Sequence, residues 1–137
     1  MSDPVRVAIH NRLLASPGVT SLLGTPTSIY HRRAPGGAKP PLVVYDKRSG
    51  VPNYSFGGQP VDRTLWIVRG VAFARTADRA EDIGAAIDAA LTDAPLTIFG
   101  RHLLEICRES DVNYVEQVGK EQFQHVGAMF RVLTQPS

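Results

Sequence analysis

Two residues of the sequence, Cys107 and His125, have side chains suited to covalent catalysis by a thiol. If the strands that contain them pair, both side chains could lie on one sheet face, as a nucleophile and its general base would, with Glu105 next along that face. A catalytic thiol needs an exposed, electropositive pocket, whereas a cysteine in the middle of a strand is commonly an inert core residue. We therefore interpret Cys107 as structural.

No other arrangement of residues indicates catalysis or metal binding. The four histidines fall on separate expected elements and lack the spacing of metal ligands: His10, His31, His102 and His125. Phosphate-binding loops, dinucleotide fingerprints, nucleophile elbows and zinc-protease motifs are absent from the sequence. A single cysteine excludes an internal disulfide framework and a cysteine-based structural zinc site. We expect a protein that is not an enzyme and that needs no cofactor or metal.

Length and composition indicate one soluble globular domain, residues 1–137. Hydrophobic residues make up 43% of the chain and charged residues 20%, as in ordinary globular proteins. Fifteen basic and thirteen acidic side chains leave a net charge of +2, too small an excess to indicate nucleic-acid binding. Arg6, His10 and Arg12 interrupt the N-terminal region before an apolar run develops, so we expect no signal peptide and no membrane segment.

Two helices are expected to support the domain. Residues 3–15 read as a helix with Ser2 as its N-cap, and an apolar face formed by Val5, Ala8, Ile9 and Leu13. Residues 77–92 read as a second helix with Thr76 as its N-cap. Its apolar stripe contains small residues that allow close approach to a sheet: Ala80, Ile83, Gly84, Ile87, Ala90 and Leu91.

The remaining periodic segments read as strands. They are 28–31, 42–45, 63–74, 96–109, 112–118 and 121–134. In the segment 63–74 both sets of alternating residues are largely apolar, which is typical of a strand that is covered on both faces. The sequence therefore predicts an α+β domain whose mostly antiparallel sheet has 63–74 near its centre, flanked by the N-terminal helix and the helix at 77–92.

The longest segment without periodicity is 49–60. Hairpin loops usually have two to five residues, so a loop of this length suggests a purpose. Tyr54 and Phe56 lie in it, and a freely solvated loop has little use for two aromatic rings. The rings either fold back onto the domain or pack on a neighbouring subunit, and the sequence leaves both alternatives open.

The order of these segments resembles the tail-completion or tail-terminator proteins of long-tailed bacteriophages and related gene-transfer particles. The resemblance spans nearly the whole chain, although each motif is weakly specific alone. After the N-terminal helix, the matching motifs are Ile29-Tyr30, Pro40-Pro41 followed by Leu42 to Tyr45, the long loop, Leu65 to Val68, the helix with Ala80, Ile83, Ile87 and Leu91, and Phe130-Arg131-Val132 in the last strand.

The resemblance implies a structural virion protein, assembled in the host cytoplasm, that forms a ring, typically a hexamer, at the head-proximal end of the tail. Such a ring caps the tail tube, stops its polymerisation and joins the tail to the head connector, while DNA passes through the lumen without sequence-specific binding. No membrane is involved. We expect the interface with a neighbouring subunit or with the tail tube at Arg48, Asn53, Tyr54 and Phe56.

Two alternatives remain open at this point. Within virion proteins, the chain could be another neck protein, such as a head-completion or connector subunit. From a different class, it could be a small α+β binding domain or an enzyme that uses Cys107 and His125.

Overall fold

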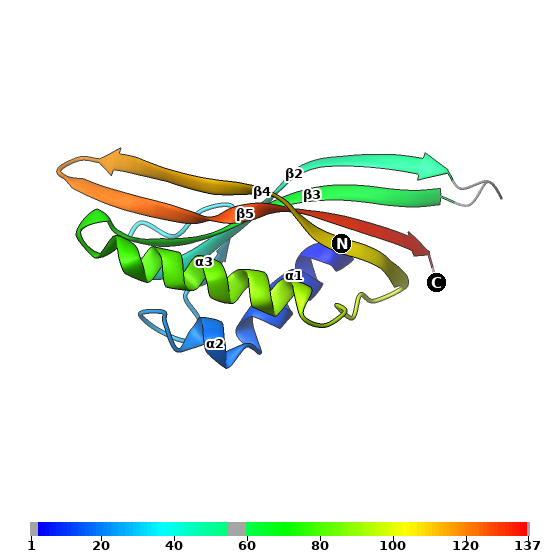
Figure 1. The fold of residues 1–137 in the computed structure, drawn as a ribbon, viewed down its shortest axis with the longest axis horizontal. Coiled ribbons are helices and arrows are strands. Elements are labelled where there is room, and N and C mark those ends of the chain that lie inside the picture. The colour runs from blue at the N-terminus through cyan, green and yellow to red at the C-terminus, as the bar shows by residue number, and fades with distance from the viewer. Residues whose placement is uncertain (1–2, 55–59, 137) are drawn as a thin grey trace.

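The computed structural model describes residues 3–54 and 60–136 (Figure 1). In chain order the elements are α1 (Pro4–Leu14), α2 (Pro17–Thr20), β1 (Ile29–His31), β2 (Leu42–Tyr54), β3 (Pro60–Phe73), the 3-10 turn η1 (Ala74–Thr76), α3 (Ala77–Thr92), β4 (Arg101–Val118) and β5 (Glu121–Pro136). Among the described residues, no helix is both long enough and apolar enough to cross a lipid bilayer.

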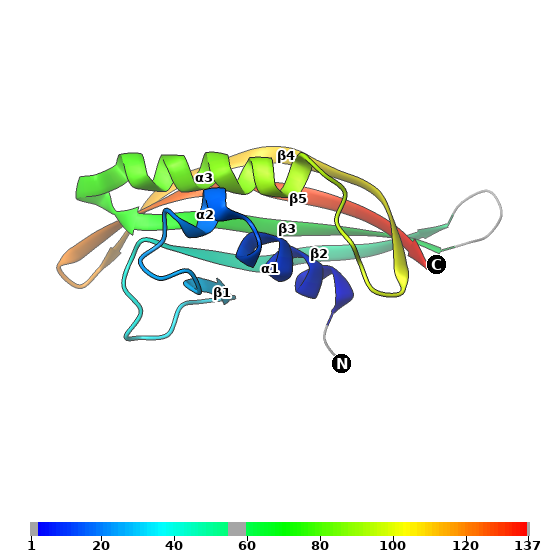
Figure 2. The ribbon, with the colours of Figure 1, turned by 90° about the horizontal axis from the view of Figure 1, so that it is seen from below.

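The strands form one sheet in the order β1-β2-β3-β5-β4, with β3 in the middle. β1 runs parallel to β2, and the other neighbouring strands are antiparallel. All three helices lie on the same side of this sheet (Figures 1 and 2). The structure confirms the predicted α+β class, the mostly antiparallel sheet and the central position of the strand at 63–74.

The main core lies between the sheet and the helices. Trp66 and Val68 of β3 face the helices and are almost completely buried. They share one apolar cluster with α1, α3 and the flanking strands, including Ile9, Leu13, Ile83, Ile87, Leu91, Tyr45 and Phe130. The predicted apolar faces of both helices are confirmed, since Val5, Ala8, Ile9 and Leu13 are buried in α1, and Ala80, Ile83, Ile87 and Leu91 in α3.

Two glycines allow α3 to approach the sheet closely. A Cβ atom on Gly70 of β3 would lie 2.4 Å from Cγ2 of Ile83. A Cβ atom on Gly84 of α3 would lie 3.1 Å from Cγ1 of Val126. At each glycine, the space that a side chain would need is already filled by a residue of the facing element, Ile83 at Gly70 and Val126 at Gly84.

The opposite face of the sheet is covered only in part. At one end Leu42, Val44 and Val71 form a second apolar cluster, against which Ala34 and Ala38 of the β1–β2 connection pack. The prediction that each face of the central strand is covered therefore needs a correction, because no helix among the described residues covers this face. A connection rich in proline and glycine covers one end of it instead.

Three boundaries also differ from the sequence prediction. Asp3, not Ser2, caps α1, and its carboxylate accepts a hydrogen bond of 2.9 Å from the Val5 amide. The predicted strands 96–109 and 112–118 are one strand, β4, which begins at Arg101, because pairing with β5 continues through Asp111. Arg101 follows Gly100, whose positive φ of 74° starts the strand after a turn.

The predicted loop at 49–60 is largely strand. β2 continues to Tyr54 and stays paired with β3 up to the pair of Tyr54 and Pro60. Within the predicted loop, residues 55–59 lie outside the described residues. Strand pairing uses backbone groups, so it needs no side-chain periodicity. Pro52 is tolerated because β1 pairs only with Val43–Tyr45 and leaves the far half of β2 as an edge.

The resulting sheet is elongated, with a hairpin at each end of its long axis (Figure 1). The β2–β3 hairpin forms one end and the β4–β5 hairpin forms the other. The two ends are unlike in sequence, and each has one open strand edge.

Candidate interaction surfaces

Three of the four residues predicted to contact a partner lie on strand β2 of the β2–β3 hairpin. Arg48 is exposed at a β-bulge, where the register shifts between Lys47 and Ser49. In the backbone ladder Asn53 pairs with Val61 and Tyr54 with Pro60. Phe56 lies outside the described residues. Strand β2 therefore brings Arg48, Asn53 and Tyr54 to one end of the molecule, while the role of the four residues as an interface stays a prediction.

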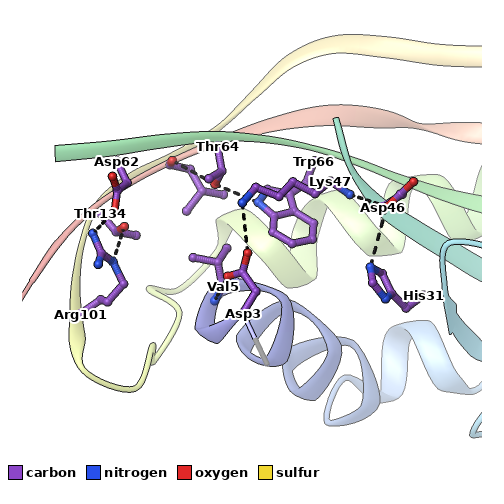
Figure 3. A network of polar contacts seen from close by, with 11 residues as sticks. Asp3, Val5, His31, Asp46, Lys47, Asp62, Thr64, Trp66, Arg101 and Thr134 are labelled. Atoms are coloured by element: carbon purple, nitrogen blue, oxygen red, sulfur yellow. Dashed lines mark hydrogen bonds and ion pairs between the residues drawn. The ribbon is translucent and has the colours of Figure 1, made fainter. Parts of the chain in front are cut away.

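Polar contacts fix the base of this hairpin to the rest of the fold (Figure 3). The Lys47 ammonium donates to the Asp3 carboxylate at the start of α1, over 3.2 Å. On the neighbouring strands, Arg101 donates to Asp62 over 2.6 Å and to Thr134 over 2.8 Å. Strand β2 is thus tied to α1 at Lys47, and β3 is tied to β4 at Asp62, close to the outer end of the hairpin.

The opposite hairpin carries a second surface, along the edge strand β4. Most of the large apolar side chains that are exposed in the described part of the chain lie on or just before this strand. Tyr114, Val115 and Val118 lie at the hairpin end of β4, with Val118 at 55% exposed, whereas Leu104 and Phe99, which is 92% exposed, lie at the other end of the strand or just before it. An open strand edge that also carries apolar side chains is a ready template for pairing with another chain.

Acidic side chains outnumber their basic partners along the same strand. Arg131 of β5 forms ion pairs with two carboxylates of β4, Glu105 at 3.5 Å and Glu109 at 3.7 Å. Arg108 likewise forms ion pairs with both Asp111 and Asp88. Because each guanidinium neutralises about one charge, the edge keeps a surplus of negative charge. Sequence analysis missed this surface, although the recurrence of carboxylates between Glu105 and Glu116 was a signal of it.

His125 is the centre of a buried polar group on the face away from the helices. Its Nδ1 accepts a hydrogen bond of 3.1 Å from Nε of Arg69, and its Nε2 donates to Glu116 over 2.9 Å. Tyr114 stacks on the imidazole with ring centres 4.4 Å apart. His125, Arg69 and Glu116 line one side of a cleft of about 330 Å³, whose other side is the β1–β2 connection. Both ring nitrogens are occupied, which defines a neutral imidazole that links β3, β5 and β4.

The possible catalytic pair is not assembled. Cys107 pairs with Arg131 in the backbone ladder, whereas His125 pairs with Tyr114. The strands do pair and both residues occupy the same face, but six residues of β5 separate the two sites, which is about 20 Å along a strand. Since both nitrogens of His125 are already bonded, it does not serve as the base of this thiol. No cluster of three or more metal-ligating side chains occurs among residues 3–54 and 60–136.

We predict that acid destabilises the protein partly through His125. Burial lowers the pKa of His125 below the usual 6.5, Arg69 lowers it further, and the Glu116 carboxylate opposes them. A depressed pKa means that the unfolded chain takes up the proton first as the pH falls below 6.5, so the free energy of unfolding should decrease there. Above that range the imidazole is neutral in both states and contributes no slope.

The measurement is urea unfolding of wild type and His125→Gln at several pH values between about 7.5 and 5, the range in which histidine side chains titrate. As the pH falls, the free energy of unfolding should decrease less for the variant than for wild type. The same exchange at exposed His102 is the control. Parallel pH profiles for wild type and His125→Gln would contradict the prediction.

The comparisons with known proteins give the class to which this fold belongs. A chain in the solved structure described as the virion of a native gene transfer agent particle has the same fold. The TM-score is 0.79 at 18% sequence identity, and the match covers 96% of this chain and 94% of that chain. No curated protein matches the sequence.

The family follows from the sequence itself. The family model "Tail completion protein gp17" matches residues 7–135, nearly the whole chain, so the protein belongs to this family of tail completion proteins. This confirms the resemblance drawn from the order of its segments. The protein is a structural component of a bacteriophage-type tail and is part of the virion.

Proposed function

We propose that the protein assembles into a ring, typically of six copies, at the head-proximal end of the tail. There it caps the tail tube, stops its polymerisation and joins the tail to the head connector, and DNA passes through its lumen without sequence-specific contacts. Membership of the tail completion family supports this role.

One structural observation supports the proposed ring. The sheet has an open strand edge at each of two unlike ends, β2 at one and β4 at the other. Contacts between unlike surfaces are heterologous, and they form a closed ring when the rotation between neighbours completes a circle. The predicted contact residues Arg48, Asn53 and Tyr54 lie on one of these ends. A neighbouring subunit or the tail tube remains the predicted partner of these residues and of Phe56, which is outside the described residues.

The experiment is assembly of tails from purified tail tube subunits with and without this protein. With the protein, tube growth should stop, and negative-stain images should show a ring at one end of each tube. Without it, tubes should grow to irregular lengths, and packaged heads should fail to join them.

The alternative neck role gives a different result. A head-completion or connector subunit should bind the portal end of heads and leave the growth of isolated tail tubes unchanged. That outcome would overturn the capping role and leave the assignment to the tail completion family intact.

A further inference from the structure

We infer that neighbouring copies of this chain join end to end by strand pairing, with the β4 edge of one copy against the far half of β2 of the next. This inference rests on the proposed ring and names the surface that builds it. The partner on each open edge is a second copy of this chain.

The first argument is the register of each edge. β4 carries two bulges, between Leu103 and Glu105 and between Arg108 and Ser110, and from there its pairing with β5 is regular to Val118. β2 carries one bulge at Arg48 and is regular from Ser49 to Tyr54. Bulges discourage edge pairing, so the bulged parts are protected, and the two regular stretches are the parts free to receive another strand.

The second argument is the position of these stretches. The regular part of β2 lies at one extremity of the sheet and the regular part of β4 at the other (Figure 1). The short strand β1 pairs only with Val43–Tyr45, so it leaves the outer half of β2 open. A copy placed at one end thus meets the unlike end of its neighbour.

The third argument is charge. Residues 109–122, the end that contains the β4–β5 turn, have four acidic side chains and one lysine. Three of the four acidic side chains, Glu109, Asp111 and Glu121, form ion pairs with arginines outside this range, and two of these arginines are shared with a further carboxylate. Residues 47–63, the opposite end, have three basic side chains and one aspartate. Within the described residues no carboxylate forms an ion pair with Arg48 or Arg63, and both side chains are exposed. Two ends of opposite charge attract each other and disfavour contacts between like ends.

The fourth argument is the apolar surface on the acidic end. Val115 and Val118 are more than half exposed, and Tyr114 is 41% exposed. Added strands gain affinity from backbone hydrogen bonds and specificity from alternate side chains. Pairing along this edge would bury these side chains and satisfy the free backbone groups of β4 at the same time.

The test uses two charge reversals that should fail alone and succeed together. Arg48→Glu with Arg63→Glu makes both ends acidic, and Glu109→Lys with Asp111→Lys makes both ends basic. Each variant alone should remain monomeric at concentrations where wild type forms rings, with at least about a tenfold rise in the concentration needed for assembly. An equimolar mixture should form rings in which the two variants alternate, because every contact then joins opposite charges.

Analytical ultracentrifugation and negative-stain images measure the assembly, and far-UV circular dichroism confirms that each variant is folded. Glu81→Lys with Asp82→Lys, on the exposed face of α3, is the matched control and should assemble like wild type. If a reversal does not fold, the neutral exchanges Arg48→Gln with Arg63→Gln replace it and should weaken assembly in the same direction.

The outcomes separate this inference from the proposed function. If wild type forms rings on tail tubes and the reversals form them equally well, the strand-edge contact is wrong and the capping role stands. If wild type forms no ring either alone or on tail tubes, the proposed function fails and the inference fails with it. Recovery of rings only in the mixture supports both.

Discussion

Replacing Ile67 with aspartate should leave the protein largely unfolded. Ile67 lies in the middle of the central strand β3 and is only 4% exposed. Its cross-strand neighbours are Met129 of β5 and Asp46 of β2. A carboxylate here would be buried with no cationic side chain directly opposite it, and it would face a second carboxylate, that of Asp46, across the ladder. An uncompensated buried charge costs about 3–5 kcal/mol, a large share of the roughly 5–15 kcal/mol that stabilises a domain.

Circular dichroism and thermal unfolding check this prediction. Ile67→Val is the matched control, because it removes one methylene at the same site and should cost only about 0.5–1.5 kcal/mol. A folded Ile67→Asp variant with a thermal midpoint near that of Ile67→Val would show that this face of the central strand is open to water.

The second large effect is expected at Gly127. A Cβ atom at this position of β5 would lie 2.0 Å from the carbonyl oxygen of Val68 and 2.6 Å from Cα of Arg69. Both are backbone atoms of the neighbouring central strand, so no side chain can turn away to relieve the contact. Gly127→Ala should separate β3 from β5 locally and reduce the free energy of unfolding by about 3 kcal/mol or more.

Gly18→Ala provides the control for this exchange. Gly18 lies in α2, and a Cβ atom there meets nothing within 4 Å. Alanine at such a site should raise stability by about 0.4–1 kcal/mol, because it restricts the unfolded chain. Urea unfolding distinguishes the two variants, and equal stability of Gly127→Ala and wild type would show that the two strands are farther apart than the structure places them.

The sequence predicted the elements whose burial repeats with a simple period. In α1 and α3, residues three or four apart are apolar and share one face, so the helices and their buried faces followed from spacing alone. The central strand was recognisable because its residues are largely apolar on both faces, both at the odd and at the even positions. Period and polarity are local properties, and they predict local structure well.

The extent of β2 and β4 was not predictable in the same way. Ser49 to Tyr54 contain glycine, proline and asparagine, which locally favour a turn, and the pairing with β3 overrides that preference. Asp111 interrupts the apolar pattern of β4, and its pair with Ala128 keeps it in the strand. A partner strand that is distant in sequence decides both cases, so local patterns cannot reveal them.

The same limit applies to the candidate sites. The sequence left open whether the strands of Cys107 and His125 pair. They do, and the separation of the two residues depends on the register between β4 and β5. The charge difference between the two ends of the sheet depends on which hairpins lie at opposite extremities. Both properties are set by the topology, whereas residue types alone were sufficient to show that the usual catalytic motifs are missing.

The pairing of the long strands has a mechanical consequence. β3 and β5 pair from Asp62 with Thr134 to Phe73 with Phe123, and β4 stays paired with β5 along its full length. A force that pulls the two ends of the sheet apart acts parallel to these strands, so it loads many backbone hydrogen bonds in shear at once. Bonds loaded together resist far more force than bonds that open one after another. The subunit should therefore resist extension along the direction of its long strands.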